Sequence, residues 1–398
     1  MFTEAPPEFN PDGLLPPPLP ERDWPVLSLA PDVSGHCNLA CRYCAEGATL
    51  PSRPGMTVEM LAAAWPLLYD HDSTAPRSIR LGSGEPLLGL PLLHQLADMI
   101  ERSPAPRASV HITTNGTLAT REVRDWLVAA GWHVKISLDG PRAVHNRWRV
   151  DRGGQGTFDR IADAVMDLAE RLPPERFSVT AVLCAGTDPH EVFEGIAALG
   201  VRRIELVPVV HRDAAIMAGP DDIARYEQFV LAHARRYLEC DDWTGIPTLV
   251  EFTGNVFRLM GYLLSRVPCA AGRSMVGVAP DGSIYPCFRF IGLERYRLGR
   301  LPEGIDPVAS AAFQRGAGRP YEERAACRAC WTAPLCGGPC FACAEMFGPG
   351  GGEPLAVHCA YRRACAGAAT RLVAQLRQHD PDRLLRFLPD SVTAILRD

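Results

Sequence analysis

The sequence has almost no lysine, no excess of positive charge and no long apolar run. Of its 41 lysines and arginines only Lys135 is a lysine, and the formal net charge of the 398 residues is -5. A chain without a basic excess shows no general preference for nucleic acid or for an anionic membrane. No apolar stretch approaches the roughly 18 residues of a membrane span, and no signal-peptide pattern opens the chain. These absences predict a cytoplasmic protein without membrane spans.

Cysteine, by contrast, is abundant and unevenly distributed. Nine of the 14 cysteines lie between Cys269 and Cys365, in a stretch with many glycines and prolines and little periodicity. In a reducing compartment, closely spaced cysteines hold metal more often than they form disulfides. Bound metal can also stabilise a segment that has too little apolar core. We therefore expect a metal-binding C-terminal domain over residues 269–366.

The part of the chain before the cysteine-rich region predicts an α/β fold. Between residues 26 and 220, short β-rich runs alternate with amphipathic helical runs, which is typical of a parallel sheet. The expected strands cover residues 26–30, 79–82, 110–113, 134–138, 179–183 and 204–209, and the expected helices cover residues 58–69, 92–101, 123–130, 158–172 and 192–199. Six such units indicate a partial (β/α)6 TIM-like barrel, whose reactive residues gather at the C-terminal ends of the strands. A proline-rich extended arm (1–25), a helical bridge (221–268) and a C-terminal helical segment (367–398) complete the expected domains.

Three cysteines, Cys37, Cys41 and Cys44, follow the first expected strand with the spacing C-x3-C-x2-C. Three thiolates on one short loop can bind three irons of a 4Fe-4S cube and leave the fourth iron open for chemistry. A structural zinc ion, the alternative, normally takes four ligands, and no fourth cysteine lies nearby. The spacing, together with Tyr43 before the third cysteine, resembles the signature of the radical S-adenosylmethionine (SAM) superfamily. The resemblance implies that the open iron binds SAM, that SAM is cleaved to a 5'-deoxyadenosyl radical, and that Tyr43 lies against the adenine.

A glycine-rich turn follows the second expected strand. Its residues, Gly82, Ser83, Gly84, Glu85 and Pro86, resemble the GGEP element of the same family, which binds the SAM amino group. Glycine lets the backbone approach a ligand closely. A tight turn between a strand and a helix is the plain alternative. We expect the Glu85 carboxylate to pair with the ammonium group of SAM rather than to stabilise the fold.

Polar residues also end the next two expected strands. The resemblance implies contacts from Asn115 and Ser137 to the SAM carboxylate and ribose, and a carboxylate contact from Arg147 or Arg149. Each has a plainer alternative, because Asn-Gly is a common turn and an arginine is often a solvated surface charge.

The C-terminal cysteines have the spacing C-x12-G-x4-C, then C-x2-C-x5-C-x3-C, then one further cysteine. This spacing resembles the seven-cysteine pattern of SPASM domains, and the resemblance implies two auxiliary 4Fe-4S clusters and thus three clusters in all. The ligation of that family would assign Cys269, Cys287 and Cys340 to the first auxiliary cluster, and Cys327, Cys330, Cys336 and Cys359 to the second. A zinc-ribbon-like domain is the alternative.

The first auxiliary cluster would then have only three cysteine ligands. Many relatives carry a further cysteine about six residues after the first, where this chain has Met275. A thioether is a poor ligand beside a thiolate, so Met275 is not expected to bind. Two possibilities stay open: the cluster keeps an open iron that could bind a substrate thiolate, or Cys343 fills the position.

The sequence around Cys269 and Cys327 resembles that of ribosomal-peptide maturases, which form thioether or carbon-carbon crosslinks. We therefore expect an enzyme that acts on a peptide, with a flavodoxin- or ferredoxin-type reductant and with leader recognition by a separate protein or by the barrel surface. Anaerobic sulfatase maturases share the architecture, but they place a carboxylate base where this chain has Phe288, which cannot accept a proton. Formylglycine formation, oxidation of a small alcohol or sugar, and a non-catalytic iron-sulfur electron carrier are the alternatives. The glycine-rich turn argues against a carrier, because a carrier needs no SAM-binding turn. The sequence indicates no catalytic base.

Overall fold

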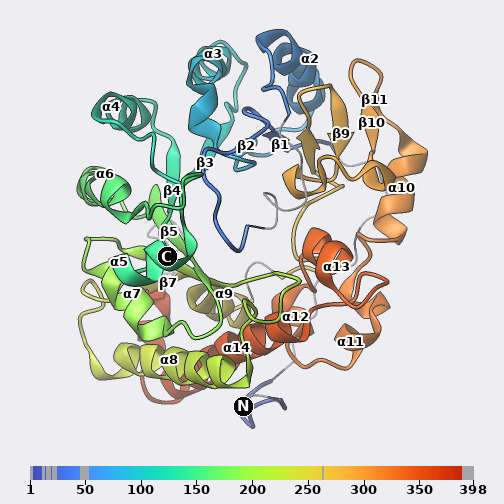
Figure 1. Ribbon diagram of the computed structural model, residues 1–398. Coiled ribbons are helices and arrows are strands. Elements are labelled where there is room, and N and C mark those ends of the chain that lie inside the picture. Colours follow the sequence, from blue (N-terminus) through green and yellow to red (C-terminus); the bar gives the residue numbers. More distant parts are fainter. Residues whose placement is uncertain are drawn as a thin grey trace.

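The computed structural model describes residues 3–10, 14, 19, 25–44, 53–261 and 264–387. Its centre is one 11-stranded sheet with the order β11-β10-β9-β8-β1-β2-β3-β4-β5-β6-β7. Figure 1 shows this sheet curving into an open ring with most of the helices on its outside. The expected α/β fold with a partial parallel barrel is confirmed.

All six expected strands are present. They are β1 (Ser28–Pro31), β2 (Ser78–Leu81), β3 (Ser109–Thr114), β4 (His133–Ser137), β5 (Phe177–Leu183) and β6 (Arg203–Pro208), and each pairs in parallel with the next. The expected helices between them are α2 (Val58–Tyr69), α3 (Leu90–Glu101), α4 (Arg121–Ala129), α6 (Phe158–Arg171) and α7 (Pro189–Ala197). Two short elements, the 3-10 turn η1 (Pro86–Gly89) and the helix α5 (Arg142–Trp148), lie in the connections after β2 and β4.

The strands have an apolar outer face and a polar inner face. In β4, Val134 and Ile136 are buried in the main core, whereas Lys135 between them is half-buried and lines an interior cavity. In β6, Ile204 is buried and the next residue, Glu205, lines the same cavity. Successive side chains of a strand point to opposite faces, so the apolar set packs under the helices and the polar set faces the inside of the ring.

The sheet is larger than the sequence indicates. β7 (Thr248–Leu249) pairs in parallel with β6, inside the expected helical bridge. On the other edge, β8 (Met275–Val278) pairs in parallel with β1, and β9 (Ser283–Tyr285), β10 (Gly299–Arg300) and β11 (Gly304–Ile305) follow as antiparallel strands. The sheet therefore runs without a break across residue 269, where the cysteine-rich domain was expected to begin. Strands of two to four residues are too short to show an alternating pattern.

The glycine of the C-x12-G-x4-C motif has a structural reason. Gly282 lies between β8 and β9 with φ +84°, and a Cβ atom there would lie 3.1 Å from the Met60 sulfur. Glycine adopts this conformation without the steric cost that another residue would meet. The tight turn lets the chain return beside β8 and brings Cys287 to the end of this hairpin.

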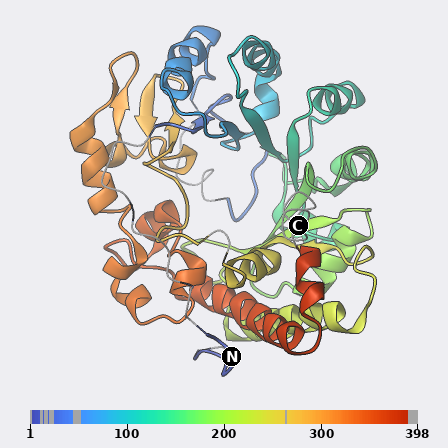
Figure 2. The ribbon, with the colours of Figure 1, turned by 180° about the vertical axis from the view of Figure 1, so that it is seen from behind.

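Three helices pack together below the ring. They are α8 (Pro220–Glu239), α9 (Val250–Leu259) and α14 (Ala356–His379), and Figure 2 shows α14, in red, beside the other two. The expected boundary between residues 366 and 367 is wrong, because it falls inside α14. Ala364 before this point and Ala368 and Leu372 after it belong to one core, so the alanine-rich helix continues past the last cysteine. Residues 388–398 of the expected final helix, and parts of the expected arm and bridge, lie outside the described residues.

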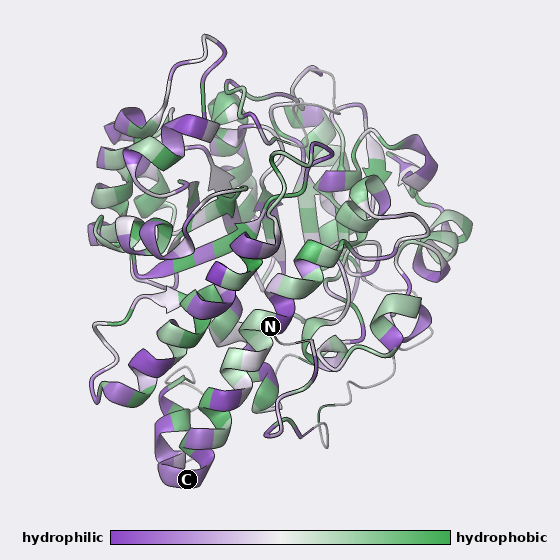
Figure 3. Ribbon diagram, turned by 60° about the horizontal axis from the view of Figure 1, so that its bottom comes forward, coloured by the Kyte–Doolittle hydropathy of each residue, from purple (hydrophilic) through white to green (hydrophobic). Residues whose placement is uncertain are grey.

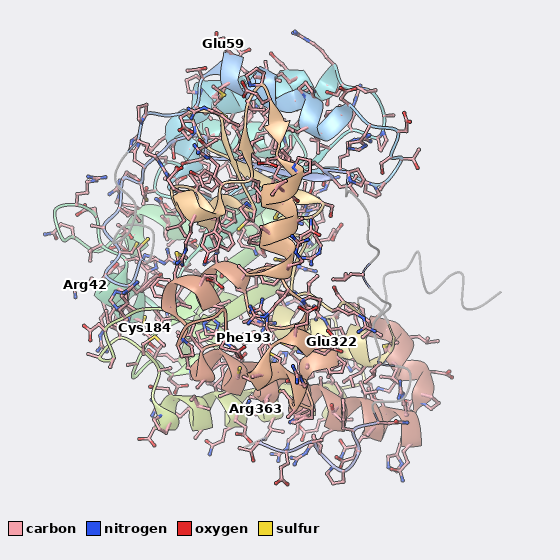
Figure 4. The ribbon with its side chains drawn as sticks, turned by 90° about the vertical axis from the view of Figure 1, so that its right-hand side faces the viewer. Arg42, Glu59, Cys184, Phe193, Glu322 and Arg363 are labelled. Carbon is pink, nitrogen blue, oxygen red and sulfur yellow. The ribbon has the colours of Figure 1, made fainter. Side chains whose placement is uncertain are left out.

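The cysteine-rich part contains mainly short helical elements. These are η2 (Phe288–Phe290), η3 (Glu294–Tyr296), α10 (Pro307–Arg315), η4 (Tyr321–Glu323), α11 (Ala325–Arg328), α12 (Ala333–Cys336) and α13 (Phe341–Phe347), and η5 (Pro381–Phe387) follows α14. Figure 3 shows hydrophilic and hydrophobic residues interleaved along the helices, as helices that cover one face of a core require. Figure 4 views the cysteine-rich part from its own side, in front of the barrel, with Glu322 labelled within it. No helix in the described ranges is long and apolar enough to cross a membrane.

Candidate active site

The loop after β1 is held by backbone contacts that do not involve its thiols. Two N–H groups of the loop donate to the carbonyl oxygens of Trp148 and Val150, each at 2.9 Å. Cys37, Cys41 and Cys44 are half-buried on this loop. Burial is the largest cause that raises the pKa of Cys37 and of Cys41, the latter to about 12, and repulsion by Cys44 raises both further. The three thiols are therefore close enough to interact, and a positively charged group between them would hold them as thiolates.

The glycine-rich turn packs directly against this loop. Gly84 has φ +57°, and a Cβ atom there would lie 2.2 Å from the carbonyl oxygen of His36, the residue before the first cysteine. The Glu85 N–H donates to the same oxygen at 2.9 Å. Only glycine permits so close an approach. Ser83 is buried, whereas Gly82 and Gly84 line the interior cavity, so the backbone of the turn is open to a ligand.

The Glu85 side chain differs from the expectation. It is fully buried, and its Oε1 accepts hydrogen bonds from the Thr114 hydroxyl at 2.6 Å and the Leu87 N–H at 3.0 Å. Its Oε2 accepts from the Asn115 N–H at 2.7 Å. Burial raises the pKa of this carboxyl group, and the three hydrogen bonds lower it. The carboxylate joins the end of β2 to the end of β3, so it has a role in the fold that the sequence did not indicate, and its contact with SAM stays a prediction.

Glu85→Gln is therefore expected to lower the free energy of unfolding by about 1–3 kcal/mol in the absence of SAM, because an amide NH2 group would face buried donors. Chemical unfolding of the purified variant measures this loss. Glu170→Gln, an exposed glutamate on α6, is the matched control and should unfold like the parent. Normal unfolding of Glu85→Gln together with weakened SAM binding would restore the original expectation.

Asn115 links the third strand to the first cysteine. Its Nδ2 donates to Asn38 Oδ1 at 2.8 Å and lies 3.7 Å from the Cys37 sulfur. Its Oδ1 accepts from the N–H and hydroxyl groups of Thr117, which fixes the orientation of the amide. Asn38 and Thr117 thus belong to the site, although the sequence analysis did not single them out. Ser137 stands half-buried at the end of β4, as expected from its position.

Tyr43 and Arg149 meet at the buried carboxylate of Asp139. The Tyr43 hydroxyl donates to Asp139 Oδ2 at 2.6 Å, and Arg149 Nε donates to the same oxygen at 2.9 Å. The Val182 N–H donates to Oδ1 at 3.0 Å. Burial lowers the pKa of the Arg149 guanidinium, but nearby negative groups, Asp139 first, raise it on balance. The charge of Arg149 is therefore matched by Asp139 within the protein, and its contact with a SAM carboxylate stays a prediction. The Tyr43 ring lines the cavity, and its contact with adenine also stays a prediction.

Arg149→Met is expected to destabilise the protein by about 3–5 kcal/mol, since it would leave the Asp139 carboxylate buried without its partner. Denaturant unfolding measures the loss, and Asp139→Asn in the same chain should recover most of it. Arg42→Met removes an exposed arginine from the cysteine loop and serves as the control. Equal stability of the Arg149 and Arg42 variants would contradict a structural role for this ion pair.

Four C-terminal thiols form one group in the cysteine-rich part. Cys327 belongs to α11, Cys330 follows it, Cys336 ends α12, and Cys359 lies in the first turn of α14. Burial is the largest cause that raises the pKa of Cys327 to about 12 and of Cys359 to about 11, and the charges of Cys336 and Cys330 raise both further. The structure thus brings together the four cysteines that were expected to share the second auxiliary cluster.

A second group contains Cys269, Cys287, Cys340 and Cys343. Burial raises the pKa of Cys287 to about 12, and Cys340 and Cys269 raise it further. Cys343 lies on the first turn of α13, three residues after Cys340, and a hydrogen bond between the two thiols lowers the pKa of Cys340 and raises that of Cys343. Arg289 Nη1 lies 3.8 Å from the Cys343 sulfur. The structure therefore places Cys343 beside the three cysteines expected for the first auxiliary cluster.

One cavity of about 890 Å³ connects these parts. The first loop lines it with Tyr43 and Cys44, and the turn after β2 lines it with Gly82 and Gly84. Seven C-terminal thiols line it as well: Cys327, Cys330, Cys336, Cys340, Cys343, Cys359 and Cys365. Ligand sites usually measure about 300–1,000 Å³, so this cavity is large for a single ligand.

The barrel has a polar lining that was not predicted from the sequence. The rings of His111 and His133 stack with their centroids 4.3 Å apart, and Lys135 Nζ donates to Glu205 Oε1 at 2.5 Å. Glu251, in the first turn of α9, lines the same cavity. The signal was available, because polar residues occupy every second position of β3 and β4 and recur in β6.

Comparison with known proteins agrees with this geometry. A model of the Radical SAM superfamily matches residues 32–206, which include the first cysteine loop and the glycine-rich turn. The chain is a radical SAM enzyme. This radical SAM enzyme is 24% identical over 334 residues to a serine-type anaerobic sulfatase-maturating enzyme of Klebsiella aerogenes, and the match covers 81% of each chain.

Two solved structures share the fold of this radical SAM enzyme. One is anSMEcpe with bound AdoMet and Kp18Cys peptide, which has a TM-score of 0.74 at 21% identity over 88% of this chain and 99% of that chain. The other is SuiB of Streptococcus suis bound to its precursor peptide SuiA, with a TM-score of 0.54 at 16% identity over 83% of this chain and 75% of that chain. Taken together with the superfamily match and the sequence relation to sulfatase-maturating enzymes, these structures indicate an enzyme of the SPASM and sulfatase-maturase type.

Proposed function

We propose that this radical SAM enzyme modifies a peptide by removing a hydrogen atom from one of its side chains and closing a thioether or carbon-carbon crosslink. The shared cavity carries the proposal, because the first cysteine loop, the glycine-rich turn and the C-terminal thiols all face it. Its volume of about 890 Å³ leaves room for a substrate side chain beside SAM. The precursor peptide bound to SuiB supports a peptide as the class of substrate.

The donor sets fit one SAM-binding and two auxiliary iron-sulfur clusters. Across the described ranges, no three His, Cys, Asp or Glu side chains gather in the way a single metal ion would need. A 4Fe-4S cube spreads its thiolates over different irons, so more widely spaced thiol groups suit it better than they suit zinc. When bound by Cys37, Cys41 and Cys44, such a cluster supplies the electron that cleaves SAM to a 5'-deoxyadenosyl radical.

The chain's own groups would bind and orient SAM around this loop. The backbone of Gly82 and Gly84 is exposed to the cavity where the SAM amino group would bind. The Asn115 amide, oriented by Thr117, points toward the Cys37 sulfur. The Tyr43 ring, fixed through its hydroxyl by Asp139, presents a flat apolar wall to the adenine.

Formylglycine formation in a sulfatase is the second candidate, because the Klebsiella aerogenes relative is a sulfatase-maturating enzyme. The residue after Cys287 speaks against it. A maturase would place its carboxylate at this position, where the chain has Phe288. The Phe288 side chain lines the cavity, and the Arg289 guanidinium lies over its ring, 5.6 Å from the centroid. Both reactions remove two hydrogens from a peptide, so the choice between them depends on the bond that forms.

The test uses the reconstituted enzyme with SAM, a chemical reductant and two synthetic peptides. One peptide is encoded by a short reading frame beside the gene, and the other carries the modified cysteine of a sulfatase. We expect 5'-deoxyadenosine and a crosslink in the first peptide, seen by mass spectrometry as the loss of two hydrogens without a free aldehyde. An aldehyde on the second peptide would make formylglycine formation the function. Formation of 5'-deoxyadenosine with both peptides unchanged would refute peptide modification. A flavodoxin or ferredoxin should replace the chemical reductant.

A further inference from the structure

Glu251 is a carboxylate that faces the shared cavity from the edge of the barrel. It lies in the first turn of α9, directly after β7, and is half-buried. Its Oε2 accepts a hydrogen bond from the Leu206 N–H at 3.3 Å, which fixes the side chain against β6. The cavity that it lines is the one bordered by Gly82 of the glycine-rich turn and Cys343 of the C-terminal thiols. A carboxylate here can reach the space assigned to the substrate.

Charged and titratable groups surround Glu251 on several elements. Glu205 on β6 lies nearby and is paired with Lys135 of β4 at 2.5 Å. Of the other groups on the cavity wall, Tyr226 on α8 and Arg362 and Cys365 on α14 interact with Glu251. The same cavity is also lined by Arg203 on β6, Cys336 on α12 and His358 and Tyr361 on α14, and Arg258 lies on α9 itself. Burial first, and repulsion by Glu205 second, raise the pKa of Glu251 to about 7, although Arg362 lowers it. A carboxylate with such a pKa can accept a proton near neutral pH and release it again.

We propose that Glu251 is the base that accepts the proton lost by the substrate. This inference rests on the proposed peptide modification, in which the substrate loses two hydrogens. The first leaves as a hydrogen atom to the 5'-deoxyadenosyl radical, and a carbon radical remains on the peptide. Closing a bond from this radical to a second group breaks the S–H or C–H bond of that group and releases one proton and one electron. The proton goes to the Glu251 carboxylate, and an oxidised iron-sulfur cluster held by the C-terminal cysteines would accept the electron.

Other residues on the cavity wall suit this role less well. Phe288, at the position where a maturase carries its base, has no group that can accept a proton. The charge of Glu205 is matched by Lys135. His358 adjoins Cys359, and burial lowers the pKa of its ring to about 4. Glu251 is thus the carboxylate that combines access to the cavity with a pKa near neutrality.

The test compares the holoenzyme with Glu251→Gln, using whichever of the two synthetic peptides the parent enzyme consumes. We expect the variant to form 5'-deoxyadenosine but to yield at least about 100-fold less modified peptide, the usual scale of a lost general base. In the parent, product formation should rise as the pH passes through about 7, because only the carboxylate accepts a proton. Glu205→Gln should move this rise to lower pH, since it removes the repulsion that raises the pKa of Glu251.

A second readout does not depend on activity. The pKa of Glu251 is raised from about 4.5 to about 7 by folding, so its ionisation progressively destabilises the fold as the pH rises between these values. Glu251→Gln should therefore gain thermal stability relative to the parent over this range, whereas the exposed control Glu170→Gln should not. Normal product formation by Glu251→Gln, or a pH dependence unmoved by Glu205→Gln, would overturn the role of Glu251. If the parent enzyme modifies neither peptide, the proposed peptide modification is refuted, and the role of Glu251 in it is refuted as well. If Glu251→Gln does not fold, the role of Glu251 is tested by Glu205→Gln alone, through the pH at which its product formation rises.

Discussion

Replacing Cys37, Cys41 and Cys44 together with alanine is expected to abolish 5'-deoxyadenosine formation and to leave the protein folded. The iron content should fall by about four atoms per chain, which is one cube. Iron analysis and chromatographic detection of 5'-deoxyadenosine after incubation with SAM and a reductant measure the two effects. The size of the first effect follows from the chemistry, since these three cysteines would hold the cluster that passes an electron to the sulfonium of SAM.

The survival of the fold follows from how the loop is held. Its backbone is tied to the carbonyl oxygens of Trp148 and Val150, and the Arg152 guanidinium donates to the Cys37 carbonyl oxygen at 2.7 Å. None of these bonds uses a sulfur atom. The C-terminal thiols come from other segments, beginning at Cys269, so their clusters should remain and give the visible absorption that is left.

Cys240→Ala is the control for this triple variant. Cys240 is exposed, follows α8 and belongs to none of the three thiol groups, so its loss should change neither iron content nor 5'-deoxyadenosine formation. If the triple variant still cleaves SAM at the parental rate, the loop that carries Cys37, Cys41 and Cys44 does not hold the cluster that cleaves SAM. A triple variant that loses the iron of all three groups would show that the clusters depend on one another.

The sequence predicts the barrel because its strands are long enough to carry a period of two. β5 alternates buried and half-buried positions over seven residues, and the cysteine loop follows β1 at the end where ligands bind in such folds. The spacing of the C-terminal cysteines also predicts both thiol groups. These cysteines lie on or beside short helices, where the number of residues between two cysteines determines their relative positions. What spacing cannot show is which side chains are already engaged within the protein.

Glu85 and Arg149 illustrate that limit. Each stands where a ligand-binding residue was expected, yet Glu85 accepts three hydrogen bonds from the protein and Arg149 pairs with a fully buried aspartate. Their partners are up to 30 residues away in the chain, beyond the reach of a local motif. Glu251 was missed for the opposite reason, because it lies in no motif and reaches the cavity only when β7 and α9 close against β6.

Cys343→Ala is expected to remove the fourth protein ligand from the first auxiliary cluster. The thiol is buried, is hydrogen-bonded to Cys340 and lies near Cys287, so it occupies the position left vacant by Met275 along the chain. Four thiolates hold a cube more firmly than three, and an iron without a thiolate is open to exchange and loss. We therefore expect the variant either to lose up to one cluster's iron or to keep a cluster whose spectrum responds to an added thiol peptide.

The experiment is cleanest in the chain that already lacks Cys37, Cys41 and Cys44, where only the auxiliary clusters contribute. In this background the spectrum should not change when a thiol peptide is added, because all four corners of the first auxiliary cluster are occupied. Adding Cys343→Ala should lower the iron content or make the spectrum sensitive to the peptide. Cys365→Ala is the matched control, since this thiol is also buried and lines the same cavity but bonds to the Tyr226 hydroxyl at 3.1 Å.

The outcome also decides how the substrate can be held. If Cys343 closes the cluster, a peptide cysteine cannot bind to iron there, and the cavity must orient the substrate through its polar wall. A different result would instead establish an open iron. In that case the spectrum would change on addition of the thiol peptide while Cys343 is still present, and Cys343→Ala would leave the iron content unchanged. In that case the cluster would hold the substrate sulfur directly. The hydrogen bond from Cys343 would then orient Cys340, which binds the cluster, and Cys343 itself would not bind iron.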